Sequence, residues 1–506
     1  MKIKDAKLIA GRKEKLEGRL ARNAPFKSPC YNLDYEVSDR VRGTSHGGVA
    51  ALMELARGSG LAENIDADVL VLGQHRPYKE SDHIFALVAS VLAGGTCPED
   101  MRRLRKDGEF LDSIGMDRFP DSTTSGDFLR RFTTTEIGAL QDAILRTTEQ
   151  VLRAKLFPDE RRVGHIDADG SMVETGAETM AGIDYNGHKR VWGYHPLLIS
   201  LANTAQPLML VNRPGNVPSH QGAAQALDVV VKSMLEVFDR VMLRGDTDFS
   251  QTKHLDGWHE DGRIDFVFGY DACPKLRGIA EALPGGAWRE LSRPILIDQA
   301  ASVPGKPRAK PERIKDAIVK ERGFKTLKLV HEHIAEFEYQ PVACKRVYRM
   351  VCVRKEIEVT QGQLELENEI RYYFYITNLV GGPSEEIVLN ANRRCNQENL
   401  ISQLKGQVHA LSCTSNTLEA NWAWMVIASL AWTLKSWFAL FAPVTERERL
   451  VGMEFRTFQN YFMNLPAQIV RSARRSVLRL IGGCAAALEV FLNTWADIRK
   501  LRRLRT

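Results

Sequence analysis

Between residues 163 and 270 the hydrophobic pattern changes from helical to strand-like, and this change limits the possible folds most. Short apolar runs come first, followed by an amphipathic helix over Ala223–Phe238. A strand at Val241–Leu243, a short helix and a strand at Ile264–Tyr270 complete the order. This alternation is typical of an α/β fold built around a sheet. The early strand runs are Val163–Val173, Val191–Tyr194, Leu197–Asn203 and Leu208–Val211.

Three acids stand out against this element order. Asp169 lies on the first strand, Asp246 comes just beyond Val241–Leu243, and Glu398 falls in a later helical segment. Asp167 and Asp169 are two residues apart on one strand, so both side chains point to the same face. Two carboxylates on one face are costly unless water or cations surround them. The plainer alternatives are an Asp-Gly turn at Asp169 and a helix cap at Asp246.

Glu398 has two basic neighbours at helical spacing. At about 100° per residue, Arg394, Glu398 and Lys405 fall within roughly 60° of one another on a helix. Leu400 and Leu404 point elsewhere, toward a core. A simple Arg394–Glu398 ion pair, worth a few tenths of a kcal/mol, is the plainer alternative. A base, an acid and a base on one edge would suit a phosphate held beside a metal ion.

Three carboxylates of this kind suit the cutting and joining of phosphodiesters. Two cations about 3.5–4 Å apart can activate the nucleophile and neutralise the leaving oxygen. Mg²⁺ prefers oxygen ligands and retains water, so few carboxylates suffice. The chain has neither a GxxxxGK[ST] nor a GxGxxG loop, so ATP or dinucleotide chemistry is not expected. Its eight cysteines show no CxxC spacing, so zinc has no support.

The segments outside this core are helical and partly basic. Residues 45–155 have helical periodicity, and in Phe119–Phe132 a proline and an aspartate precede a helix start. We expect a compact helical module whose second helix, with Arg130 and Arg131, enters a DNA groove; a plain helical hairpin is the alternative. Lys and Arg gather at both ends of the chain although the net charge is only +6. Such clusters favour a polyanionic partner; solvated helix faces and chain ends are the alternative.

The apolar stretch Trp422–Phe441 raises the question of a membrane span, which needs about 20 apolar residues. Lys435 interrupts the stretch, and Asn421 and Pro443 bound it closely. We therefore predict a buried core helix and no membrane partner. The basic N-terminus lacks the apolar core of a signal peptide, and the cysteines are scattered. A reducing cytoplasm is the expected location.

At 506 residues the chain is too long for one ordinary core. The predicted class is α/β, with a ribonuclease-H-like catalytic core, a β-rich insertion, and helical N-terminal and C-terminal regions. The expected regions are a helical DNA-binding region at 1–155, the first part of the core at 156–272, the β-rich insertion at 273–388, the last core helices at 389–442, and a basic helical region at 443–506.

The chain resembles bacterial insertion-sequence transposases of the DDE type. Within them it is similar to transposase DDE domain group 1, the insertion-sequence family numbered 1380. The motifs that carry this resemblance are Phe119–Phe132, Asp167-x-Asp169-x-Ser171, Arg244-x-Asp246-x2-Phe249, Glu398-x6-Lys405 and Gly452–Asn460.

The resemblance implies that Asp169, Asp246 and Glu398 are catalytic and hold two Mg²⁺ ions, with Mn²⁺ as a possible substitute. Asp167 would assist as a ligand or lie just outside the ligand set. Related transposases carry a Tyr-x2-Arg-x3-Glu-x6-Lys signature, in which Ala391 takes the tyrosine position in this chain. That departure leaves open the phosphate contact or stacking that the tyrosine provides, and with it any hairpin intermediate.

The resemblance also implies a partner, double-stranded DNA, bound as the inverted repeats at the element's ends and as target DNA. Arg244, Arg394 and Lys405 would contact this DNA. A homodimer in the bacterial cytoplasm, at the nucleoid, would carry out cut-and-paste movement. Two alternatives remain: a related nuclease that cuts without joining, and a DNA-binding repressor with a silent catalytic site.

Overall fold

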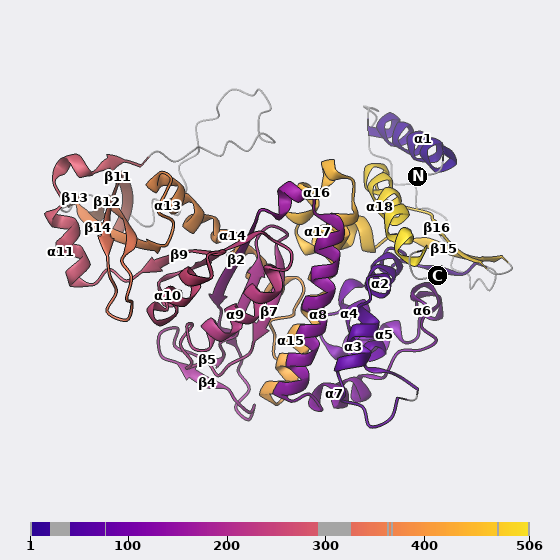
Figure 1. The fold of residues 1–506 in the computed structure, drawn as a ribbon. Coiled ribbons are helices and arrows are strands. Elements are labelled where there is room, and N and C mark those ends of the chain that lie inside the picture. The colour runs from indigo at the N-terminus through magenta and orange to yellow at the C-terminus, as the bar shows by residue number, and fades with distance from the viewer. Residues whose placement is uncertain are drawn as a thin grey trace. The chain divides into compact units, whose positions relative to one another are not determined.

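The computed structural model describes residues 3–20, 41–75, 77–291, 325–361, 364–365, 368–472 and 475–503, and Figure 1 shows its ribbon. The chain forms two compact units. The first unit comprises residues 1–239 and 396–506, and the second unit comprises residues 240–395. Residues 292–324 of the expected β-rich insertion lie outside the described residues. The α/β class is confirmed, whereas the five functional regions stay predictions.

The N-terminal part of the first unit is helical, as the periodicity predicts. Asp121 caps the helix expected within Phe119–Phe132, because its carboxylate accepts a hydrogen bond from the Thr124 amide at 2.8 Å. Thr133 and Glu136 form a capping box that starts the next, longest helix of this part. The elements are α1 Ile3–Leu20, β1 Gly43–Thr44, α2 Val49–Gly58, α3 Leu61–Asp68, α4 Glu80–Leu92, η1 Pro98–Asp100, α5 Met101–Leu104, α6 Gly108–Ile114, α7 Ser122–Arg130, α8 Thr134–Lys155 and η2 Pro158–Arg161.

The first unit then forms an antiparallel array of three strands, in the order β2, β6, β7. The register places Asp169 opposite Leu198 and Asp167 opposite Ser200. A smaller sheet has the order β3, β5, β4. The first predicted strand ends at Gly170 rather than at Val173, and the predicted helix ends at Met234. The elements are β2 Val163–Gly170, β3 Val173–Glu174, β4 Asp184–Asn186, β5 Val191–Tyr194, β6 Leu197–Leu201, β7 Gln206–Val211 and α9 Ala223–Met234.

Helix α15, Leu418–Phe441, is the central core helix of the first unit. It contacts α4, α7, α8 and β7 and runs beside α8 in Figure 1. Three indole N–H groups anchor it, because Trp422, Trp424 and Trp432 donate to the backbone oxygens of Leu210, His409 and Ala205. Among the described residues this one helix is long and apolar enough to cross a membrane, yet its apolar window is 100% buried inside the protein. The prediction of a buried core helix is confirmed.

Lys435 is the exception inside this helix, since its side chain is 0% exposed. Its ammonium group donates to the carbonyl oxygen of Val451 at 2.7 Å and lies 4.1 Å from the ring centroid of Trp432. Val451 is the last residue of α16, so the lysine ties the end of that helix to the core. Burial lowers the pKa of Lys435 to about 7.

The C-terminal part differs from the wholly helical prediction, because a β-hairpin follows Pro466. β15 and β16 pair antiparallel, with Val470 opposite Val477, and β15 also pairs with β1. The apolar residues of this segment also fit a helical spacing, so the sequence did not indicate two strands. Pairing of β15 with β1, which is distant in the sequence, favours the strand conformation. The elements are α16 Val444–Val451, α17 Phe455–Phe458, η6 Gln459–Met463, β15 Ala467–Ser472, β16 Arg475–Leu480 and α18 Ala485–Arg503.

The second unit is a mixed sheet in the order β10, β11, β12, β14, β9, β8. Strands β8 and β9 are parallel, and the other neighbours are antiparallel. Strand β11 pairs with β12 along its length, with a register shift between Leu329 and His331. The elements are β8 Arg240–Gly245, η3 Thr247–Phe249, α10 Thr252–Asp261, β9 Ile264–Tyr270, α11 Pro274–Ala282, η4 Gly285–Ala287, β10 Arg289–Glu290, β11 Lys325–Tyr339, β12 Tyr348–Gln361, β13 Leu364–Glu365, β14 Glu369–Thr377 and α13 Ser384–Arg393; α14, Cys395–Gly406, follows.

Candidate functional site

Asp169 lies at the end of β2 with a half-exposed side chain, whereas Asp167 on the same strand is buried. Gln397 of α14 donates to the backbone oxygens of Asp167 and Leu198, each at 3.0 Å. One amide therefore fixes the N-terminal part of α14 to both β2 and β6. Glu398 is the next residue and is exposed. The first unit thus holds the helix of Glu398 against the strand of Asp169.

Lys405 fixes the other end of α14. Its ammonium donates to the backbone oxygen of Met172 at 2.6 Å, three residues beyond Asp169. Burial lowers the pKa of Lys405, and the charge of Asp169 opposes that shift. The structure therefore places Lys405 close to Asp169. A half-buried cation beside a carboxylate is an arrangement that can neutralise a phosphate bound at Asp169.

Asp246 follows strand β8 in the second unit, as predicted. Its carboxylate accepts from the Asp248 amide at 3.0 Å and so caps the short helix η3. Burial raises the pKa of Asp246, Arg394 opposes this, and the charges of Asp248 and Asp271 raise it further. Asp271 comes directly after β9, the parallel neighbour of β8. Carboxylates thus gather beyond the ends of two adjacent parallel strands.

The predicted helical edge of Arg394, Glu398 and Lys405 is wrong for Arg394. Helix α13 ends at Arg393 and α14 begins at Cys395, so Arg394 lies in the break between them. Its amide donates to the oxygen of Ala391 at 3.3 Å, in the last turn of α13. Glu398 and Lys405 do share one helix. The break is a tertiary feature that a continuous helical pattern in the sequence does not reveal.

The remaining predicted DNA contacts have different surroundings. Arg244 is 3% exposed on β8, and one of its Nη atoms donates to the Asn390 oxygen at 3.4 Å. This burial favours a role in positioning α13 over a contact with DNA, and the DNA contact stays a prediction. Arg130 is exposed at the end of α7 and pairs with Asp127 at 2.6 Å. Arg131 is exposed as well.

A divalent cation fits the donor chemistry of the three predicted ligands, Asp169, Asp246 and Glu398. Their oxygens are carboxylate oxygens, which Mg²⁺ prefers, and Asp248 and Asp271 add negative charge near Asp246. Within the described parts of the chain, no group of three or more His, Cys, Asp or Glu side chains is gathered as a metal site. The metal set therefore stays a prediction.

Two residues near these acids were missed from the sequence. Asp271 stands just after a strand, as Asp246 does, and that shared position was the available signal. Gln397 had no comparable signal. Its role depends on two backbone oxygens that lie far away in the sequence.

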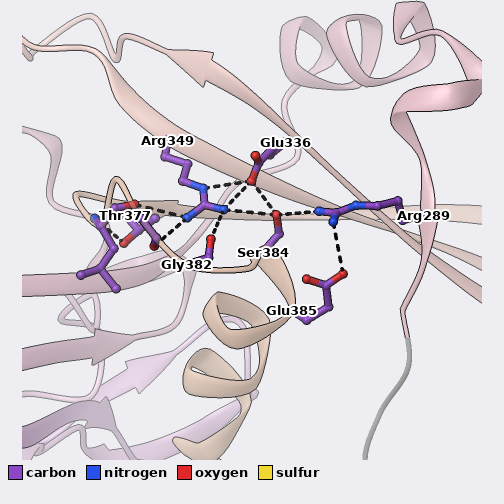
Figure 2. A network of polar contacts seen from close by, with 9 residues as sticks. Arg289, Glu336, Arg349, Thr377, Gly382, Ser384 and Glu385 are labelled. Atoms are coloured by element: carbon purple, nitrogen blue, oxygen red, sulfur yellow. Dashed lines mark hydrogen bonds and ion pairs between the residues drawn. The ribbon is translucent and has the colours of Figure 1, made fainter.

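A polar network in the second unit holds the helix that leads to Arg394 and α14 (Figure 2). Arg349 of β12 donates to the Glu336 carboxylate at 2.6 Å and to the Gly382 oxygen at 2.9 Å. The hydroxyl of Ser384, the first residue of α13, donates to the same carboxylate at 2.5 Å. These hydrogen bonds, that of Ser384 first, lower the pKa of Glu336. Strands β11 and β12 thereby fix the start of α13.

Replacing Arg349 by methionine should lower the free energy of unfolding by about 2 kcal/mol, because several charge-assisted hydrogen bonds are lost. The partner Glu336 is 44% exposed, which limits the loss. Arg371→Met is the matched control, since its pair with Glu369 is exposed on both sides and should contribute less than about 1 kcal/mol. Urea denaturation of both variants measures the difference. Equal losses would show that the network does not hold α13.

Comparison with known proteins agrees with the resemblance. A family model described as transposase DDE domain group 1 matches residues 39–503. Among solved structures, the chain is similar to the cryo-EM structure of a piggyBac transposase synaptic complex with hairpin DNA, at 10% identity, over 93% of this chain and 84% of that chain, with a TM-score of 0.35. That likeness is too distant for a comparison of sites. No curated protein matches the chain.

Proposed function

The chain belongs to the transposase DDE domain group 1 family, and we propose that it moves its own element by metal-dependent DNA cleavage and strand transfer. The element is a bacterial insertion sequence of the family numbered 1380, and the catalytic core is ribonuclease-H-like. The observation that carries this proposal is the double attachment of α14. Gln397 attaches this helix to β2 and β6, and Lys405 attaches it close to Asp169. The position of the helix that bears Glu398 is therefore fixed within the first unit.

Asp169, Asp246 and Glu398 are the proposed ligands of two Mg²⁺ ions, with Asp167 as an assisting neighbour and Mn²⁺ as a substitute. Such cations supply Lewis acidity and lower the pKa of water. The chain's own side chains do the rest of the work. Lys405 brings positive charge to a phosphate at Asp169, and Arg394 brings it to the acids around Asp246. No His, Ser or Cys is required as a nucleophile, because water and then a 3′-hydroxyl attack phosphorus.

The proposed partner is double-stranded DNA, first as the terminal inverted repeats of the element and then as target. A homodimer would hold two ends in one synaptic complex in the cytoplasm. The proposed phosphate contacts are Arg130 at the end of α7, Arg131 directly after it, and the basic residues near both chain ends. Affinity should therefore fall steeply as salt rises, since each neutralised phosphate releases counterions.

Cleavage of the element's own ends tests this proposal directly. The full chain is incubated with DNA that carries the two ends of the element, with Mg²⁺ or with EDTA. We expect cut ends and joined strand-transfer products with Mg²⁺ only. Cutting without any joining would favour the nuclease alternative. Binding to the ends without cutting, in Mg²⁺ and in Mn²⁺, would overturn the proposal in favour of a silent repressor.

A further inference from the structure

The β4–β5 hairpin of the first unit carries an exposed pair of aromatic side chains. Tyr185 and Trp192 lie opposite each other in the register, with ring centroids 5.6 Å apart. Tyr185 is 42% exposed and Trp192 is 53% exposed. Large rings paired on a surface leave apolar area in water, and such patches commonly mark a binding site.

Contacts with the rest of the first unit hold this hairpin. The Asn186 amide donates to the Gly215 oxygen at 2.8 Å, and its side-chain oxygen accepts from the Lys189 amide. Gly215 packs so closely that a Cβ atom there would meet the Asp184 oxygen at 2.4 Å. Tyr194 is buried, and its hydroxyl donates to the Ala181 oxygen. The backbone that carries the two aromatic side chains is therefore fixed, which lowers the entropic cost of binding a ligand there.

A short path through the backbone connects the hairpin to Asp169. β5 pairs with β3 through Tyr194 and Val173. The residue before β3 is Met172, whose oxygen accepts the hydrogen bond from Lys405. The charge of Lys189, in the turn of the hairpin, is also close enough to contribute to the lowered pKa of Lys405. Tyr185 and Trp192 therefore belong to the small sheet β3–β5–β4, whose first strand begins one residue after the Met172 carbonyl that Lys405 contacts.

The charges of the hairpin indicate what it binds. Its turn carries His188, Lys189 and Arg190, and the backbone of Arg190 is held in the left-handed region at φ 57°. A basic turn next to flat rings is the combination that binds a nucleic acid strand with accessible bases, because each base stacks on a ring while the phosphates meet the cations. Paired bases inside a duplex do not offer their faces in this way.

We propose that Tyr185 and Trp192 stack on an unpaired DNA base close to the phosphate at Asp169, with Lys189 and Arg190 on the adjoining backbone. This inference rests on the proposed function for the location of the reacting phosphate. It adds a strand-separated DNA end, rather than a fully paired one, as the form that this edge of the site recognises. The two rings position the DNA strand and do not take part in the bond changes.

Fluorescence anisotropy with two labelled probes tests the hairpin. The probes are an oligothymidine of about 20 nucleotides and a blunt duplex of similar length. Trp192→Ala in the full chain should weaken oligothymidine binding about tenfold, because stacking on one base contributes roughly 1–3 kcal/mol, and should change duplex binding less than about twofold. Trp192→Phe should retain most of the affinity. Phe157→Ala removes a ring of similar exposure, 49%, elsewhere in the first unit and should change neither.

Circular dichroism first establishes that each variant is folded. A loss that is equal for both probes, or no loss for oligothymidine, would overturn the proposal. So would a loss of self-association with unchanged DNA binding, which would assign the rings to contact between copies. Cleavage of the element's ends is scored separately. If cleavage occurs and Trp192→Ala binds oligothymidine normally, only the hairpin assignment fails; if cleavage never occurs but the probe preference depends on Trp192, only the catalytic proposal fails.

Discussion

Asp246→Asn should lower the rate of DNA cleavage at least about a thousandfold. Loss of a ligand charge removes several kcal/mol of transition-state stabilisation, and each 1.36 kcal/mol corresponds to a factor of about ten. The fold should survive. Asparagine is as good a helix cap as aspartate, so the side chain can still accept the hydrogen bond from the Asp248 amide that starts η3. Single-turnover cleavage of end DNA in Mg²⁺ measures the rate.

Two comparisons separate this effect from damage to the protein. Asp261→Asn removes an exposed carboxylate at the end of α10 in the same unit and should leave the rate within about twofold. DNA binding by Asp246→Asn in EDTA should be unchanged or tighter, since one negative charge near the phosphates is gone. A variant that cuts at the normal rate would remove Asp246 from the catalytic set.

Lys435→Met should stabilise the protein at pH 6, by an amount that shrinks as the pH rises. The folded-state pKa of Lys435 is about 7, below the value near 10.5 of an unfolded lysine. Below pH 7 both states carry the proton, and the folded state bears the full cost of a buried charge. Between pH 7 and about 10.5 the unfolded state binds more protons, so the stability of the parent protein rises with pH. Methionine fills similar space and has no proton to lose.

The expected change between pH 6 and pH 9 is roughly 2–3 kcal/mol, from about two pH units at 1.36 kcal/mol each. It is read as the difference in unfolding free energy between parent and variant, so titration of other groups cancels. Lys232→Met on the exposed side of α9 is the control and should show no pH-dependent difference. A constant gap between parent and Lys435→Met across this range would mean that the Val451 carbonyl and the Trp432 ring keep the buried lysine charged.

Local patterns predicted much of the fold. The buried α15 follows from an apolar run with polar bounds, and the exit of β8 into Asp246 follows from three apolar residues before a turn. The α7 start follows from the capping preference of Asp121. In each case the deciding interaction lies within a few residues along the chain.

What failed depends on partners far away in sequence. The break at Arg394 separates two helices that the residue pattern joins, and the β15–β16 hairpin gains its third strand from β1, more than 400 residues earlier. The burial of Arg244 in its sheet also depends on strands distant in the sequence, and its contact with DNA stays a prediction. The metal set stays a prediction, since Asp169, Asp246 and Glu398 come from three separate stretches of the sequence.

The order of the chain also sets when the first unit can be completed during synthesis. The first unit includes residues 396–506, among them α15 and the helix that bears Glu398, and the 156 residues of the second unit are made before them. At about 5–20 residues per second, that interval is roughly 8–30 s on the ribosome. Asp169 and Asp246 therefore emerge long before Glu398 and α15. Under the proposed function, a nascent chain therefore lacks a complete metal site until residues 396–506 have been made.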